Sequence, residues 1–222
     1  MKKQFVMMIT GILMLAGSSQ LMAATQYTIT DLSSLGGSHS NAWGINNSGQ
    51  VVGDNDSTSH AFLYDGTAMH DLGTLGGSTS NAFSINNSGQ VIGSSDITGD
   101  STYHAFLYDG TAMKDLGTLG GRKSEAYGIN NSGQVVGFSY IKGDSATHAF
   151  LYDGGNMIDL NTLLATGSSW VLEQAYSIND SGQIIGEGYI NGQYKSFLMT
   201  PVPEPATLLL LSLGGLLLRR RR

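Results

Sequence analysis

The middle of the chain is one sequence unit written four times, and this repetition restricts the fold more than any other feature. The phrase His-Ala-Phe-Leu-Tyr-Asp-Gly recurs at intervals of 44 residues, beginning at His60, His104 and His148. A second phrase, Ile-Asn-(Asn/Asp)-Ser-Gly-Gln, begins at Ile45, Ile85, Ile129 and Ile178. A period of this length is typical of proteins in which each repeat is one supersecondary unit.

Each unit has the pattern of four short strands. In the first unit we expect these strands at residues 42–45, 50–53, 60–64 and 68–72. Gly49 lies between the first two and supplies the positive φ that a tight hairpin requires. No sustained 3.6-residue period indicates a helix in this region. Four antiparallel strands per repeat are typical of a β-propeller blade.

The ends of the repeat array predict how a ring of blades closes. Residues 27–32 align with the fourth strand of a unit, and the last unit has no fourth strand of its own. Placing residues 27–32 in that gap leaves no open sheet edge. We therefore expect an all-β repeat protein: a four-bladed β-propeller over residues 25–200, closed by the N-terminal strand. An N-terminal signal helix and a short C-terminal hydrophobic helix flank it.

Residues 1–24 have the features of a secretory signal peptide. Lys2 and Lys3 precede an apolar stretch at residues 5–16, and the small residues Ala23 and Ala24 offer a cleavage point. The alternative is a retained membrane anchor, but the apolar stretch is short for a span of ~20 residues. We expect the protein to be exported.

The C-terminal segment, residues 201–222, has three parts in a fixed order. They are Val202-Pro203-Glu204-Pro205, an apolar run over residues 206–218, and the basic residues Arg219, Arg220, Arg221 and Arg222. As a helix the run would reach ~20 Å, against a hydrocarbon core of ~30 Å, so it is a marginal span. The arginines would stay on the cytoplasmic side. This predicts transient anchoring in the inner membrane with the folded body outside.

This tail closely resembles a PEP-CTERM sorting signal. The resemblance implies a Gram-negative, exopolysaccharide-producing bacterium and a surface or extracellular location. It also implies two partners: the secretion machinery, and exosortase, a membrane protease-transpeptidase that is thought to cut near Pro-Glu-Pro. An unprocessed tail anchor is the alternative.

The repeats resemble the extracellular HAF-repeat family over residues 27–200, through His-Ala-Phe and the Leu-Gly-Gly and Tyr-Asp-Gly phrases around it. The fourth unit departs from the pattern, because Lys195-Ser196 replaces His-Ala. A role that needs four identical histidines is therefore in doubt. The resemblance implies an extracellular location and little mechanism.

Charge and composition exclude several classes of function. Between the terminal signals the chain has five basic and sixteen acidic residues, which argues against nucleic-acid binding. The chain has no cysteine, which excludes disulfides, thiolate metal sites and cysteine nucleophiles.

Two sets of repeated side chains could hold a metal ion. Imidazoles are common metal ligands, but the three repeated histidines each begin a strand, and we favour a structural role for them. Acidic residues gather in the variable loop after the second strand, at Asp54, Asp56, Asp96, Asp100 and Asp144. Carboxylates there suit Ca²⁺, but the first loop lacks the glycine of an EF-type loop, so we expect no cofactor, with calcium as the alternative.

Two further patterns suggest chemistry more weakly. Ser101 with His104 and Ser145 with His148 have a hydrolase-like spacing, but a nucleophilic serine also needs an oriented base and an oxyanion site. Aromatic residues share one repeat position, at Trp43, Phe83, Tyr127 and Tyr176. They could stack on sugars, although packing between blades is the interpretation we favour.

The sequence thus predicts a non-enzymatic surface protein, a binding or structural component of an exopolysaccharide matrix. Its partner would be matrix polysaccharide or another surface protein, bound by the variable loops at residues 54–59, 94–103 and 138–147. The alternative is a propeller enzyme, a polysaccharide lyase or hydrolase. Its candidate residues outside the repeat pattern are His39, His70, Glu173 and Glu187.

Overall fold

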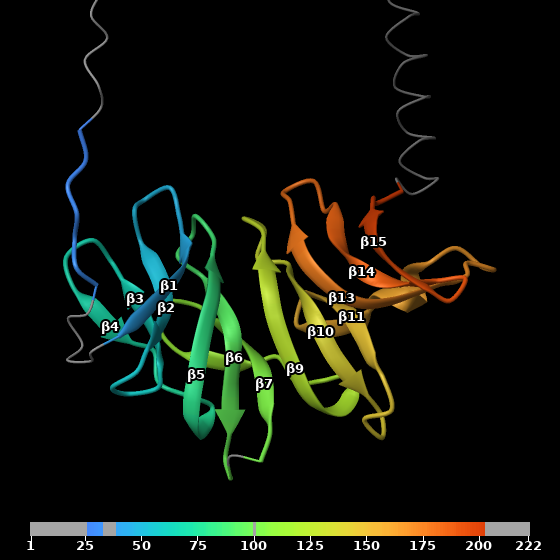
Figure 1. Cartoon of the computed structure of the whole chain (residues 1–222), viewed down its shortest axis with the longest axis horizontal. Coiled ribbons are helices and arrows are strands. Elements are labelled where there is room, and N and C mark those ends of the chain that lie inside the picture. Colours follow the sequence, from blue (N-terminus) through green and yellow to red (C-terminus); the bar gives the residue numbers. More distant parts are fainter. Residues whose placement is uncertain (1–25, 33–38, 100, 203–222) are drawn as a thin grey trace, which may run out of the picture. The chain divides into compact units, whose positions relative to one another are not determined.

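The computed structural model describes residues 26–32, 39–99 and 101–202. In these residues the fold is all-β, with four antiparallel sheets that follow one another along the chain (Figure 1). All of the strands belong to one compact unit. The only helix in the described part is the short 3₁₀ helix η1 (Leu160–Leu163), whose first residue is buried.

The strands of each sheet lie in sequence order. The first sheet contains β1 (Ser40–Ile45), β2 (Val51–Asn55), β3 (Ala61–Tyr64) and β4 (Met69–Asp71). The second contains β5 (Gly76–Ile85), β6 (Val91–Ile97), β7 (Tyr103–Tyr108) and β8 (Met113–Asp115). The third contains β9 (Gly120–Ile129), β10 (Val135–Ile141), β11 (Thr147–Asp153) and β12 (Asn156–Asp159). The fourth contains β13 (Trp170–Ile178), β14 (Ile184–Ile190) and β15 (Gln193–Met199). The predicted strands of the first unit are confirmed to within two residues.

The hairpin between the first two strands of each sheet is built by an asparagine side chain. In the first sheet, Asn46 Oδ1 accepts hydrogen bonds from the backbone N–H groups of Ser48 and Gln50. Gly49 has a φ of 77°, as the sequence predicted. The other three hairpins repeat this arrangement. The asparagine side chain thus makes hydrogen bonds that the backbone makes in an ordinary turn. This role explains why the Ile-Asn-(Asn/Asp)-Ser-Gly-Gln phrase is nearly the same in all four units.

The second strand of each sheet contains a glycine that the strand pairing requires. A β-bulge shifts the register of β1 between Ala42 and Gly44. At this point a Cβ added to Gly53 would lie 1.7 Å from the carbonyl oxygen of Asn41. The equivalent glycine in the second sheet, Gly93, would lie 1.8 Å from the carbonyl oxygen of Asn81. No residue larger than glycine fits there without moving the backbone.

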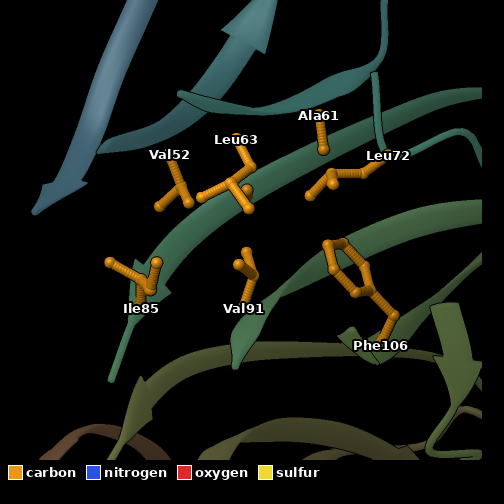
Figure 2. Packing of buried hydrophobic residues seen from close by; sticks show 8 residues of the cluster. Val52, Ala61, Leu63, Leu72, Ile85, Val91 and Phe106 are labelled. Carbon is orange, nitrogen blue, oxygen red and sulfur yellow. The ribbon is translucent and has the colours of Figure 1, made fainter. Parts of the chain in front are cut away.

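Among the described residues, three hydrophobic core clusters occur, one between each pair of successive sheets. Figure 2 shows the first cluster, in which Val52 and Leu63 of the first sheet face Ile85 and Val91 of the second. Each cluster joins the second and third strands of one sheet to strands of the next. Every sheet therefore depends on its neighbour to bury its apolar face.

The first strands of successive sheets also contact one another. The four Ile-Asn-Asn/Asp turns line a shared hollow of about 290 Å³. The four hairpins thus lie beside one another along the array.

The expected closure by an N-terminal strand is wrong for the described residues. Residues 26–32 form no strand, and the fourth sheet contains three strands only. The side chains of Tyr27 and Ile29 are exposed. Residues 27–32 resemble the fourth strand of a unit in sequence. A segment with strand propensity becomes a strand only where it pairs with a sheet edge. The predicted signal helix at residues 1–24 and the C-terminal helix at residues 206–218 lie outside the described residues.

Candidate binding surface

The variable loops occupy one end of each sheet, and the asparagine hairpins occupy the other. This follows from the antiparallel order, because the loop after the second strand shares an edge with the start of the first strand. The loop of the second sheet lies against the first residues of β9 in the third sheet. Thr102 Oγ1 donates to the carbonyl oxygen of Arg122, and the Lys123 ammonium lies 4.9 Å from the ring centroid of Tyr103. In Figure 1 the β6–β7 and β10–β11 loops point to the lower edge of the view.

A polar cavity of about 230 Å³ opens at this end, between the second and third sheets. Its lining consists of hydroxyl, amide and carboxyl side chains with one aromatic ring: Thr79, Asn81, Ser94, Ser95, Asp96, Tyr103 and Glu125. Thr79 Oγ1 donates to Asp96 at 2.6 Å. The cavity therefore presents fixed donors and acceptors close to a flat ring.

Two groups in the cavity have shifted acidities. Burial raises the pKa of Glu125 above its ordinary value of 4.5. Burial, followed by the charge of Glu125, raises the pKa of Tyr103. The Tyr103 hydroxyl thus stays protonated and able to donate, while Glu125 is a half-buried carboxyl suited to a polar ligand.

A smaller hollow of about 110 Å³ adjoins this region and is lined by Arg122, Lys123, Tyr140 and Asp144. The backbone N–H of Arg122 donates to Asp144 at 2.7 Å, and its guanidinium also contacts that carboxylate. These hydrogen bonds lower the pKa of Asp144. Asp144 therefore holds the β10–β11 loop against the start of β9.

The acidic residues that the sequence proposed for calcium have separate partners. Asp54 accepts from the side chains of Asn41 and Trp43, and Asp56 accepts from the backbone of His39. Asp96 accepts from Thr79, and Asp144 pairs with Arg122. Asp100 lies outside the described residues. Within the described ranges no group of three or more His, Asp or Glu side chains could hold a metal ion, and the loop carboxylates lie in three different sheets.

The repeated histidines pair with aspartates of the neighbouring strand. The Nδ1 atoms of His60, His104 and His148 lie 3.0, 2.8 and 2.6 Å from carboxylate oxygens of Asp71, Asp115 and Asp159. Each pair joins the third and fourth strands of its own sheet. The aspartate partners were not predicted from the sequence, although the constant spacing of eleven residues was the available signal. The favoured structural role agrees with this geometry.

The other candidate residues are dispersed. In the described contacts no hydrogen bond joins Ser101 to His104 or Ser145 to His148. His70 pairs with Asp65 in the first sheet. Glu187 accepts from the Tyr176 hydroxyl in the fourth sheet, 3.0 Å away.

The repeated aromatic position is used mainly for packing between sheets. Phe83 and Tyr127 have ring centroids 5.9 Å apart, and so do Tyr127 and Tyr176. The favoured interpretation is confirmed for these three rings. Trp43, at the start of the series, is 57% exposed.

Comparison with known families gives two matches. A family model described as "Protein of unknown function (DUF3466)" matches residues 78–200. A PEP-CTERM protein-sorting motif matches residues 201–222 and confirms the predicted sorting signal. The resemblance to the HAF-repeat family stays a prediction. A search of curated proteins found no match.

Only Pro201 and Val202 of the sorting segment lie in the described residues; the Pro-Glu-Pro core, the apolar run and the arginines lie outside them, as does the Ala23–Ala24 cleavage point. Across residues 26–32, 39–99 and 101–202, no helix has the length and apolar character needed to cross a membrane.

Proposed function

Because the chain belongs to the DUF3466 family and ends in a PEP-CTERM motif, which marks an exosortase-processed extracellular protein, we propose that it is a non-enzymatic binder of extracellular polysaccharide. The binding surface is the variable-loop end of the second and third sheets. The observation that carries this proposal is the polar cavity that includes Tyr103 and Glu125.

The chemistry of the cavity suits a sugar. Hydroxyl, amide and carboxyl groups can exchange hydrogen bonds with the hydroxyls of a pyranose, and a tyrosine ring can contact its apolar face. Loops carried on a rigid β scaffold are a common place for such recognition. The finer fold that we propose is a set of propeller blades, with the loops as its recognition end.

Basic side chains lie beside the cavity and suit the acidic groups of a polysaccharide. Of the five basic side chains in the acidic body, Arg122 and Lys123 begin β9 and Lys142 lies in the adjoining loop. Arg122 is neutralised by Asp144, which leaves the two lysines to meet carboxylate or sulfate groups of the ligand. The two lysines offset the cavity's own carboxyl groups, Asp96 and Glu125, so this end repels an acidic ligand less than the rest of the acidic body does.

The test is binding of the exported protein to polysaccharide purified from its producing cells, measured by calorimetry with and without Ca²⁺. We expect saturable binding that does not require calcium. Tyr103→Ala should raise Kd about tenfold, since it removes a hydroxyl donor and a ring contact. Glu125→Gln should raise Kd by a similar factor, since a carboxylate accepts from sugar hydroxyls at two oxygens and an amide at one only. Glu173→Gln, the same change in the fourth sheet, is the matched control.

Absence of saturable binding would refute the proposal and shift attention to a protein partner on the cell surface. The same mixtures should be assayed for reducing ends and unsaturated uronates. Release of either product would show that the alternative, a polysaccharide hydrolase or lyase, is correct.

A further inference from the structure

The interface between successive sheets is built three times from the same positions. On the second strand of one sheet, the apolar residue is Val52, Ile92 or Val136, and on the first strand of the next sheet it faces Ala82, Ala126 or Ala175. All six are fully buried. The chain therefore contains three copies of one sheet-to-sheet interface.

At each end of the array, only one of the two faces that form this interface is present. In the last sheet, Ile185 occupies the position of Val52 but is 50% exposed. Leu198, which pairs with Ile185, is 64% exposed, whereas the equivalent Leu63 is 9% exposed. This is the face that would receive a following sheet.

In the first sheet, the face that would pack against a preceding sheet is partly exposed. Ile45 is 70% exposed, whereas Ile85 and Ile178 at the same position are 7% and 6% exposed. Ala42 is also exposed. Phe62 on this sheet is buried, so the uncovered part is the half of the face near the asparagine hairpin.

The hydrogen bonds between successive hairpins also stop at the last hairpin. The Nδ2 groups of Asn46, Asn86 and Asn130 each donate to the backbone carbonyl of the next hairpin at 3.1 Å. Asn179 ends the series. In the described contacts its Nδ2 donates only to Gln183, and its side chain is exposed, whereas the other three asparagines are buried.

A second series of bonds runs parallel to the first. The backbone N–H groups of Asn47, Asn87 and Asn131 donate to the side chain of the next hairpin, at 2.9 to 3.0 Å. No such bond from the N–H of Asp180 occurs among the described residues. Each hairpin donates these hydrogen bonds to the next one along the chain. Within the described array, the last hairpin has no following hairpin to donate to, and the first has no preceding hairpin to accept from.

We propose that two copies of this chain join head to tail, with the β14–β15 face of each copy packed on the β1 face of the other. The occupant is a second copy because the exposed residues at one end are the repeat equivalents of those that cover the other end inside the chain. Asn179 would then donate to the Asn46 carbonyl of the second copy. Two such contacts, related by a two-fold axis, would cover both terminal faces of each copy. The inference is independent of the proposed polysaccharide binding.

The test is the mass in solution of the exported protein, measured by light scattering after size exclusion. We expect a dimer. Ile45→Glu and Ile185→Glu should each raise the dissociation constant more than about a hundredfold, because each places an unpaired charge in both contacts. Asn156→Glu, an equal charge change at the exposed first residue of β12, should leave the dimer intact.

Mixing the two variants distinguishes a broken contact from a misfolded chain. A mixture of Ile45→Glu and Ile185→Glu restores one intact contact per pair, so heterodimers should appear although neither variant dimerises alone. Misfolded variants would not be rescued in this way. If one variant alone stays dimeric, the contact joins like faces and the proposal is wrong. A monomeric parent protein, with these faces covered by its own chain, or a longer series of copies would also overturn it.

Discussion

At the scale of single residues, the histidine–aspartate pairs show how a repeated polar residue can serve the fold. His104 and Asp115 lie on adjacent strands, and Asp115 Oδ1 also accepts from the backbone N–H of Gly117. Burial alone would raise the pKa of Asp115, but the hydrogen bonds from His104 and Gly117 outweigh it, so the pKa lies below the ordinary 3.8. The pair thus stabilises both the strand pairing and the turn that follows.

Asp115→Asn should lower the free energy of unfolding at neutral pH by about 1 kcal/mol, the scale of a partly exposed charged hydrogen bond. A depressed folded pKa means that this contribution is fully present above pH 3.8 and is lost as the pH falls through the folded value. Urea unfolding of both proteins across that range measures it. Asp153→Asn, on β11 of the next sheet, is the control. A difference that persisted at the acid end would contradict the assignment.

At the scale of elements, the bulge in each first strand depends on the glycine of the second. Gly93 has no room for a side chain, because a Cβ would lie 1.8 Å from a backbone carbonyl oxygen of its partner strand. The sequence showed a glycine at this place in every unit, but its reason appeared only with the register of the two strands. A bulge bends its strand, and Ala82 beside the bulge of β5 is fully buried in the cluster shared with the first sheet.

Gly93→Ala should destabilise the protein by at least about 3 kcal/mol, the upper range for overpacking, because backbone has to move. Gly110→Ala in the same sheet is the matched comparison. Its φ is 99° but nothing lies within 4 Å of the added carbon, so only conformational strain of about 1 kcal/mol is expected. Denaturant titrations compare the two. Equal losses would show that the close contact at Gly93 has no special role.

At the scale of the whole molecule, the strands and the sorting signal occupy different parts of the chain and have different roles. The body contains the strands and the loops, while the PEP-CTERM motif at residues 201–222 directs processing. The three described core clusters that join successive sheets consist of residues that precede the motif. Processing should therefore leave the body folded.

The intact mass of the exported protein should lack Arg219 to Arg222, because exosortase is expected to cut near Pro203 and Pro205. Replacing both prolines with alanine should keep the tail on the protein, whereas Leu208→Ile should be processed normally. Mass spectrometry of the surface fraction distinguishes these products. Parent protein that still carries the four arginines would contradict processing.

The sequence by itself determined the four units, the strands within them, the hairpin at Gly49 and the sorting tail. These features are local: they depend on alternation, turn residues and composition over a few neighbouring positions. The same local pattern wrongly predicted a closing strand at residues 27–32, which form no strand.

The tertiary structure decided which groups meet. It paired His104 with Asp115, placed Tyr103 and Glu125 in one cavity, and left Ile45 and Ile185 exposed at opposite ends. These outcomes depend on how sheets far apart in the sequence pack. The four copies share almost one sequence, so only packing distinguishes an inner copy, whose faces are covered, from an end copy, whose face is open.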